Sequence, residues 1–168
     1  MENYEYFRSA AVFTGKHAIY IDDMWKQNDI QNSFFKRLVD LYTIAPVIGL
    51  RMHRKAKIDS SVDNKRTVQL EAIMTRREDL LTIMNLVLLL DDSDNQSVEE
   101  KVDRTFRGPE NDEQFKHYQD LFMEYCLGGI EYLHEQLIDR SLSVEDVYTD
   151  RKIGNIMALL DNSLIPNS

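Results

Sequence analysis

Residues 67–91 have the sequence TVQLEAIMTRREDLLTIMNLVLLLD, and this stretch decides the fold class of the chain. From Leu80 to Leu90 the pattern is apolar on nearly every side of a helical wheel. A helix of that kind is buried by its neighbours, so we expect residues 67–91 to form the central helix of the core. Asp91 and the polar residues after it end this helix, because carboxylates are unfavourable at the negative end of a helix dipole.

The segments on either side also have helical patterns. Glycine and proline are scarce, and no run of β-branched residues alternates with polar ones, so we predict an all-α chain. Short connections predict an irregular antiparallel bundle of about six to seven helices around residues 67–91. The other helices are expected at about 17–27, from 32 or 33 to a kink or break near Pro46, at 97–107, at 111–138, and from a capping-box-like Ser143 and Asp146 to about Leu160.

Length and composition predict one globular domain. A chain of 168 residues is near the common size of a single domain, and 43% hydrophobic with 29% charged residues lies far from the disordered range. We assign residues 1–164 to this domain and 165–168 to a short tail. Neither a signal peptide nor a membrane span is expected, so we predict a cytoplasmic protein. The lone Cys126 is expected to act as a small buried hydrophobe.

The distribution of charge is the strongest functional signal. Residues 51–77 contain eight Lys/Arg against three Asp/Glu, whereas the chain from Leu81 onward contains seven against eighteen. Exposed charges farther apart than about 8 Å are largely screened from one another at physiological salt, so the basic segment can attract an anion despite the net charge of −9. The candidate binding residues of this basic segment are Arg51, Arg54, Lys55, Lys57, Lys65, Arg66, Arg76 and Arg77.

Three roles for the basic segment remain open at this stage. Its cations can complement helix C-termini or pair with the acidic half of the chain, contact nucleic-acid phosphates, or bind an acidic protein partner. No sequence motif supports a catalytic class, a cofactor or a metal site. We therefore expect a non-catalytic helical interaction or accessory subunit, with a protein partner or nucleic acid as the ligand and no membrane contact.

The alternative function is a divalent-metal-dependent all-α hydrolase. Two carboxylate pairs, Glu100 with Asp103 and Glu110 with Glu113, resemble the pairs that hold Mg²⁺ in all-α nucleotide pyrophosphatases, although their order and spacing differ from that arrangement. Carboxylates one helical turn apart suit Mg²⁺. This hypothesis requires the four carboxylates to converge on one point in a pocket.

The helix expected at 111–138 carries the remaining candidates. On a helical wheel His117, Glu131 and His134 share one polar face, which we expect to point to solvent or to a partner. Gly128 and Gly129 lie inside the same helix, where we expect close helix packing or a kink. The residues predicted to be almost fully buried are Leu38, Leu81, Met84, Leu88, Phe122, Tyr125 and Leu133.

Overall fold

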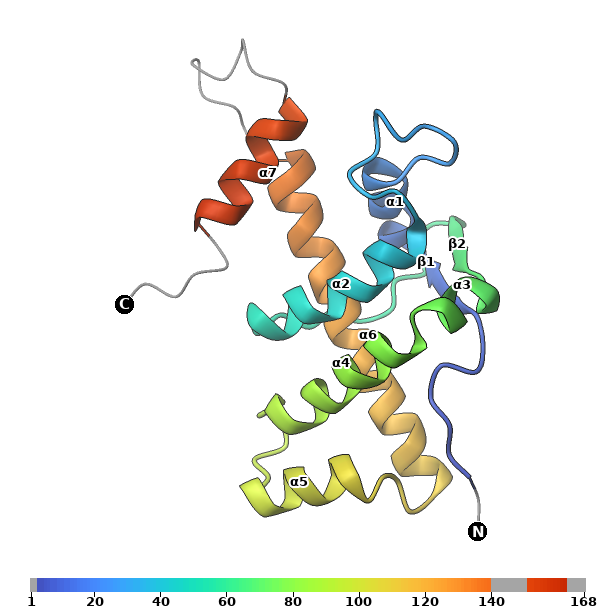
Figure 1. The fold of residues 1–168 in the computed structure, drawn as a ribbon, viewed down its shortest axis with the longest axis vertical. Coiled ribbons are helices and arrows are strands. Elements are labelled where there is room, and N and C mark those ends of the chain that lie inside the picture. The colour runs from blue at the N-terminus through green and yellow to red at the C-terminus, as the bar shows by residue number, and fades with distance from the viewer. Residues whose placement is uncertain (1–2, 140–150, 163–168) are drawn as a thin grey trace.

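The computed structural model describes residues 3–139 and 151–162. In these residues the chain forms an irregular bundle of seven α-helices with one π-helical turn and a small two-stranded sheet, which confirms the helical class (Figure 1). The elements are β1 (Ala11–Thr14), α1 (Gly15–Met24), α2 (Leu38–Arg51), β2 (Lys65–Val68), α3 (Leu70–Thr75), α4 (Arg77–Leu90), α5 (Val98–Phe106), α6 (Asp112–His134), η1 (Glu135–Asp139) and α7 (Arg151–Asn162).

Helix α6 runs through the middle of the bundle, and α2 crosses it closely (Figure 1). Its 23 residues span about 35 Å at 1.5 Å per residue. The crossing depends on glycine. A Cβ atom added to Gly129 would lie 1.7 Å from the carbonyl oxygen of Ala45, and one added to Gly49 would lie 2.0 Å from that of Tyr125. The expectation of close packing at Gly129 is therefore confirmed, and α6 rather than residues 67–91 is the central helix.

Residues 67–91 do not form one helix. Thr67 and Val68 belong to β2, which pairs antiparallel with β1 in the register Ala11 to Val68 and Thr14 to Lys65. The helical part is divided into α3 and α4 at Arg76, whose backbone (φ −118°, ψ 12°) leaves the α-helical region. At Thr67 and Val68 the prediction of helix was wrong because pairing with a strand more than 50 residues earlier in the chain overrides local helix propensity. The break at Arg76 is a second departure from the predicted continuous helix.

Several helix ends differ from prediction, and others match it. α2 begins at Leu38 rather than near residue 32, and it continues through Pro46 without the predicted break. By contrast, Ser97 and Glu100 form both hydrogen bonds of the predicted capping box before α5. The capping pair predicted at 143 and 146 and the tail at 165–168 lie outside the described residues.

The core forms around α2, α4 and α6. Six of the seven residues expected to be almost fully buried are buried, whereas Leu81 is only partly so. Cys126 is completely buried, and burial raises the pKa of its thiol, as befits an inert core residue. Among the helices described, none is both long and apolar enough to cross a membrane.

Candidate functional site

Three cations of the basic segment pair with the acidic half of the chain. Arg54 donates two hydrogen bonds to the carboxylate of Glu135, at 2.6 and 2.5 Å, and a longer one of 3.3 Å to Glu131. Lys57 binds Glu124, and the ammonium of Lys55 lies 3.9 Å from the same carboxylate. The loop after α2 is therefore held along α6 by charge, as the structural interpretation of this segment requires.

The other cations of the basic segment lie apart from this group. Arg66 on β2 binds both carboxylate oxygens of Asp22 at 2.5 and 2.7 Å, and Arg76 lies 3.2 Å from the carboxylate of Asp40. Arg51 and Lys65 are exposed and make no ion pair within the described residues. Arg77 begins α4 and is partly buried, with its Nε atom buried and without a hydrogen-bond partner in the described residues. The eight candidates thus do not form one continuous cationic surface, and their binding to an anion remains a prediction.

The polar face predicted for residues 111–138 is not wholly exposed. Glu131 is mostly buried and accepts hydrogen bonds from Lys16 at 2.8 Å and from Nε2 of His17 at 3.0 Å. His17 is fully buried. Burial opposes ionisation of Glu131, but Lys16 and His17 together hold the pKa of its carboxyl below the ordinary value. Burial lowers the pKa of His17 despite the neighbouring Glu131 carboxylate. The pair joins α1 to α6 with a neutral imidazole and an ionised acid.

His134 is buried as well, which corrects the prediction that it faces solvent. Its Nε2 lies 2.7 Å from the Asp23 carboxylate and its Nδ1 lies 3.1 Å from that of Asp139, while its ring stacks on Tyr20 at a centroid distance of 4.0 Å. His134 lies where α6 passes into the π-helical turn η1. A helical wheel of residues 111–138 includes neither the π-helical turn nor the Asp23 carboxylate of α1. It therefore placed His134 on the side that faces solvent. Only His117 of the three predicted residues is exposed.

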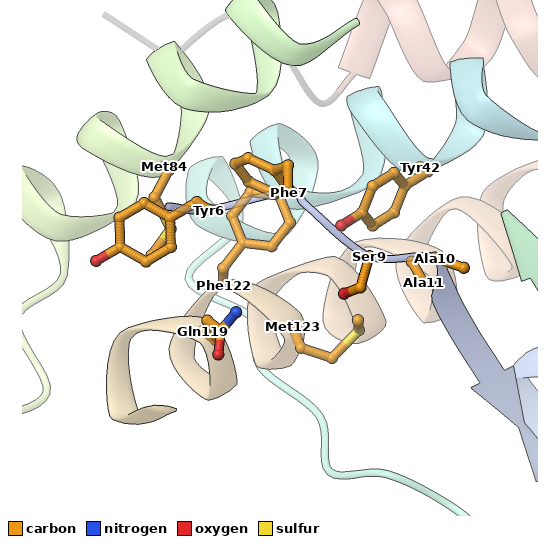
Figure 2. Close-up of a pocket in the computed structure, with 10 residues that line it drawn as sticks. All are labelled: Tyr6, Phe7, Ser9, Ala10, Ala11, Tyr42, Met84, Gln119, Phe122 and Met123. Carbon is orange, nitrogen blue, oxygen red and sulfur yellow. The ribbon is translucent and has the colours of Figure 1, made fainter. Parts of the chain in front are cut away.

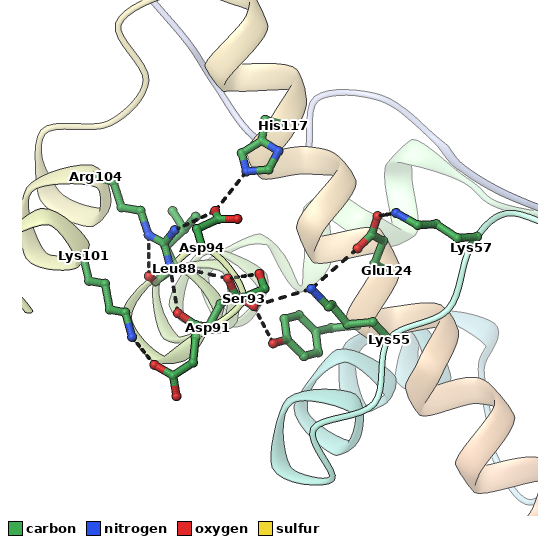
Figure 3. Close-up of polar contacts among 12 residues, drawn as sticks. Lys55, Lys57, Leu88, Asp91, Ser93, Asp94, Lys101, Arg104, His117 and Glu124 are labelled. Atoms are coloured by element: carbon green, nitrogen blue, oxygen red, sulfur yellow. Dashed lines mark hydrogen bonds and ion pairs between the residues drawn. The ribbon is translucent and has the colours of Figure 1, made fainter. Parts of the chain in front are cut away.

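A buried polar network fixes the junction of α4, α5 and α6 (Figure 3). The Asp91 carboxylate accepts hydrogen bonds from Tyr125 and Ser93, both at 2.6 Å, and lies 3.8 Å from the Lys55 ammonium. Burial opposes its ionisation, but these hydrogen bonds and the Lys55 charge hold the pKa of Asp91 below its ordinary value. Deep burial of an ionised carboxylate is tolerated only when such partners surround it.

Arg104 of α5 completes this network. It is buried, and its guanidinium donates to the backbone carbonyl of Leu88 at 2.7 Å and to that of Asp91 at 3.3 Å (Figure 3). These carbonyls belong to the C-terminal end of α4, where the last carbonyl groups of a helix lack intrahelical donors. A cation placed there is favoured by the helix dipole. Arg104 therefore attaches α5 to α4 through the polar side of α5.

The apolar side of α5 consequently points outward. Val98 is 72% exposed, Val102 43% and Phe106 71%, whereas the buried residues of α5 are Arg104 and Thr105. The three apolar residues are four positions apart, which places them on one stripe of the helix. We call this stripe the α5 face. Its outward orientation could not be predicted from the sequence, because the same spacing normally marks the side of a helix that faces the core.

The carboxylates of the hydrolase hypothesis do not converge. Glu100 receives the backbone N–H of Ser97 in the capping box, while Asp103 and Glu110 both lie beside Arg107. Throughout residues 3–139 and 151–162, no group of three or more His, Cys, Asp or Glu side chains has an arrangement that could hold a metal ion. The alternative function thus has no carboxylate cluster to support it in the described part of the chain.

A small pocket lies under the N-terminal segment (Figure 2). Tyr6, Phe7 and Ser9 cover it, and Phe122 and Met84 line it from α6 and α4. Its volume is about 120 Å³, smaller than the roughly 300–1,000 Å³ of typical ligand sites. Phe7 packs edge-on against Phe122 at a centroid distance of 5.0 Å, so the pocket is best described as a gap beneath an aromatic strap.

Comparison of the chain with protein-family models, with curated proteins and with solved structures finds no match in any of the three.

Proposed function

We propose that this protein is a non-catalytic helical interaction or accessory subunit, and that the α5 face is its principal contact surface for another protein. The observation that carries the proposal is the inverted orientation of α5, which buries Arg104 and exposes Val98, Val102 and Phe106. Amphipathic helices on a protein surface normally turn their apolar stripe toward the core. A contiguous apolar stripe left exposed is typical of an interaction site.

The energetics support this assignment. Full burial of a Val or Phe side chain contributes about 1.5–3 kcal/mol relative to exposure, so a partner that covers the α5 face gains several kcal/mol before the cost of association. The chain cannot recover this energy by rotating α5, because rotation would expose the α4 carbonyl groups that Arg104 satisfies. The exposed stripe is therefore built into the fold by its polar anchor.

The charges around the α5 face indicate a positively charged partner. Residues 91–113 contain nine Asp/Glu and three Lys/Arg. All three cations are engaged: Lys101 binds Asp92, Arg104 is buried, and Arg107 lies 3.0 Å from Asp103. The field around the stripe is thus negative, which favours a partner that presents apolar side chains flanked by Lys or Arg.

The basic segment is a secondary candidate for contact. Arg51 and Lys65 are its two exposed cations without an ion pair in the described residues, and they are the ones we propose for contact with nucleic acid or an acidic protein. Arg54, Lys55 and Lys57 already pair with the carboxylates of Glu135, Asp91 and Glu124, respectively. This surface therefore offers less charge than the sequence alone suggests.

Affinity purification with a matched control tests the proposal. Wild type, Val102→Asp and Ile58→Asp are tagged and purified from the native cells, and co-purifying proteins are quantified by mass spectrometry. Ile58 is 70% exposed on the loop between α2 and β2, so its variant controls for an added surface charge. We expect Val102→Asp to lose specific partners about tenfold or more, the factor that corresponds to 1.4 kcal/mol. Partners retained equally by all three proteins would contradict the proposal.

A further inference from the structure

A cavity of about 650 Å³ lies where the C-terminal end of α1, the start of α2 and strand β2 meet. Trp25 lines it just after the last residue of α1, Leu38 lines it from the first turn of α2, and Arg66 lines it from β2. The volume falls within the roughly 300–1,000 Å³ of typical ligand sites, unlike that of the gap beneath the aromatic strap. We call this space the Trp25 cavity.

Hydrogen bonds hold the walls of the Trp25 cavity in place. Ser33 is buried, and its hydroxyl accepts the backbone N–H of Lys26 at 2.7 Å and lies 3.1 Å from the carbonyl oxygen of the same residue. These contacts fix the loop that follows Trp25. The bidentate pair of Arg66 with Asp22 joins β2 to α1 on the same cavity. The cavity is therefore formed before a ligand arrives, which lowers the ordering cost of binding.

Several polar groups of this lining have no partner in the described part of the chain. The Lys26 ammonium makes no ion pair there, and the side-chain amides of Gln27 and Gln69 make no hydrogen bond there. The two terminal nitrogens of Arg66 each use one N–H group, on the Asp22 carboxylate and on a backbone carbonyl, and each keeps a second one. The cavity thus offers an ammonium group, guanidinium N–H groups and two amides that can both donate and accept hydrogen bonds.

The indole ring and the local charge define the class of ligand. Trp25 is partly buried against the core, and no aromatic ring within residues 3–139 and 151–162 stacks on it. The charged residues of the lining are Lys26, Arg66 and Asp22, so cations are in excess here although the chain has a net charge of −9. An aromatic face beside amides and positive charge suits a planar heterocycle that carries an anionic group. We propose that the Trp25 cavity binds one nucleotide, with its base stacked on Trp25 and its phosphate near Lys26 and Arg66.

The lining supports a single nucleotide rather than a nucleic-acid strand. Proteins that bind single strands stack successive bases on several aromatic side chains, whereas Trp25 is the only aromatic side chain among the described residues that line this cavity. A glutamine amide can donate to and accept from one base edge, as it does at N6 and N7 of adenine, and Gln27 and Gln69 each offer such an amide. The cavity shares no lining residue with the α5 face, so nucleotide binding does not depend on the proposed function.

Fluorescence and calorimetry test this site. Trp25 is the one tryptophan of the chain, so its fluorescence reports on the cavity directly. Wild type is titrated with adenosine monophosphate (AMP), with adenosine and with inorganic phosphate, and isothermal titration calorimetry gives the affinities of the variants. Lys26→Gln removes the ammonium group of the cavity, and Lys116→Gln, whose side chain is 77% exposed on α6, is the matched control for the loss of one positive charge. Trp25→Leu removes the stacking ring, and circular dichroism checks that each variant is folded.

We expect AMP to quench the fluorescence of Trp25 saturably and to bind more tightly than adenosine or phosphate. Trp25→Leu should weaken AMP binding about tenfold, within the range for the loss of one base–aromatic stack. Lys26→Gln should weaken AMP binding about threefold or more without changing adenosine binding, because only AMP carries the phosphate. Lys116→Gln should bind AMP as wild type does.

Four results would overturn the nucleotide site. The first is the absence of saturable quenching by AMP at about 1 mM. The others are equal affinities for AMP and adenosine, equal affinities for AMP and phosphate, and equal effects of the two lysine variants on AMP binding. If Trp25→Leu does not fold, the comparison of Lys26→Gln with Lys116→Gln still decides the result.

Discussion

Replacing Gly129 with alanine should destabilise the protein, although alanine is the better helix former. The added Cβ would lie 1.7 Å from the carbonyl oxygen of Ala45, whereas ordinary contacts begin at 3.4 Å. α2 and α6 would have to separate by about 1.7 Å at their crossing, the difference between these two distances. The obstacle is backbone, which cannot rotate away as a side chain can. Overpacking of this kind typically costs about 1–3 kcal/mol or more, and the gain in helix propensity is about 1 kcal/mol.

The net loss should be about 2 kcal/mol, the upper overpacking cost of about 3 less the gain of about 1, because all three atoms nearest the added Cβ are backbone atoms of α2. For a chain of this size that loss lowers Tm by about 4–8 °C. Urea melts and thermal melts followed by circular dichroism measure it. Gly154→Ala in α7 is the matched control, since nothing lies within 4 Å of the added Cβ and stability should be unchanged or slightly higher. A Gly129→Ala variant as stable as wild type would refute the close-packing argument.

Three further predictions concern the core, the buried histidine and the basic segment. Leu88→Ala should lower the free energy of unfolding by about 2–5 kcal/mol in urea melts, because Leu88 is buried in the hydrophobic core; a loss below about 0.5 kcal/mol would contradict its place in the core. His17 has a pKa lowered in the folded state, so wild type should lose stability as pH falls below about 6.5, and His17→Gln should lack this loss; equal pH slopes in melts of both proteins would refute the neutral His17. If the basic segment contacts phosphates, binding to nucleic acid should fall with salt at a log-log slope of about −0.7 to −0.9 per contact, and Arg51→Ala with Lys65→Ala should flatten it; absence of wild-type binding near about 20 mM salt would exclude this contact.

Local signals in the sequence were sufficient for several elements. The start of α5 follows from Ser97 and Glu100, because both hydrogen bonds of a capping box lie within four residues of the chain. The end of α4 before Asp91 and the glycine packing of α6 follow from equally local rules. The helical class could thus be predicted without knowledge of the tertiary contacts.

Features that depend on distant partners could not be predicted. β2 is only four residues long and exists because β1 pairs with it from more than 50 residues away. His134 is buried because Asp23, which is 111 residues earlier in the chain, reaches its ring. For β2 and for His134, the deciding interaction is made with residues far away in the chain. Local helix propensity and the helical wheel therefore predicted the wrong surroundings for them.

The orientation of the α5 face also depends on a contact with residues outside α5. The sequence shows the spacing of Val98, Val102 and Phe106, but it does not show whether these side chains face the core or the solvent. Direction is set by Arg104, which finds the α4 carbonyl groups only once the two helices are adjacent. The acidic residues around the stripe were a usable signal, because a stripe that faces the core is not usually surrounded by nine carboxylates within 23 residues.

Photocrosslinking in living cells tests most directly whether the α5 face contacts another protein chain. A p-benzoyl-phenylalanine side chain replaces Phe106, which is 71% exposed, and in a parallel protein it replaces Ile58, which is 70% exposed and lies outside the face. The account predicts a discrete crosslinked protein, either another polypeptide or a second copy of this chain, from position 106 and none from position 58. No crosslink at position 106, or the same products from both positions, would contradict it.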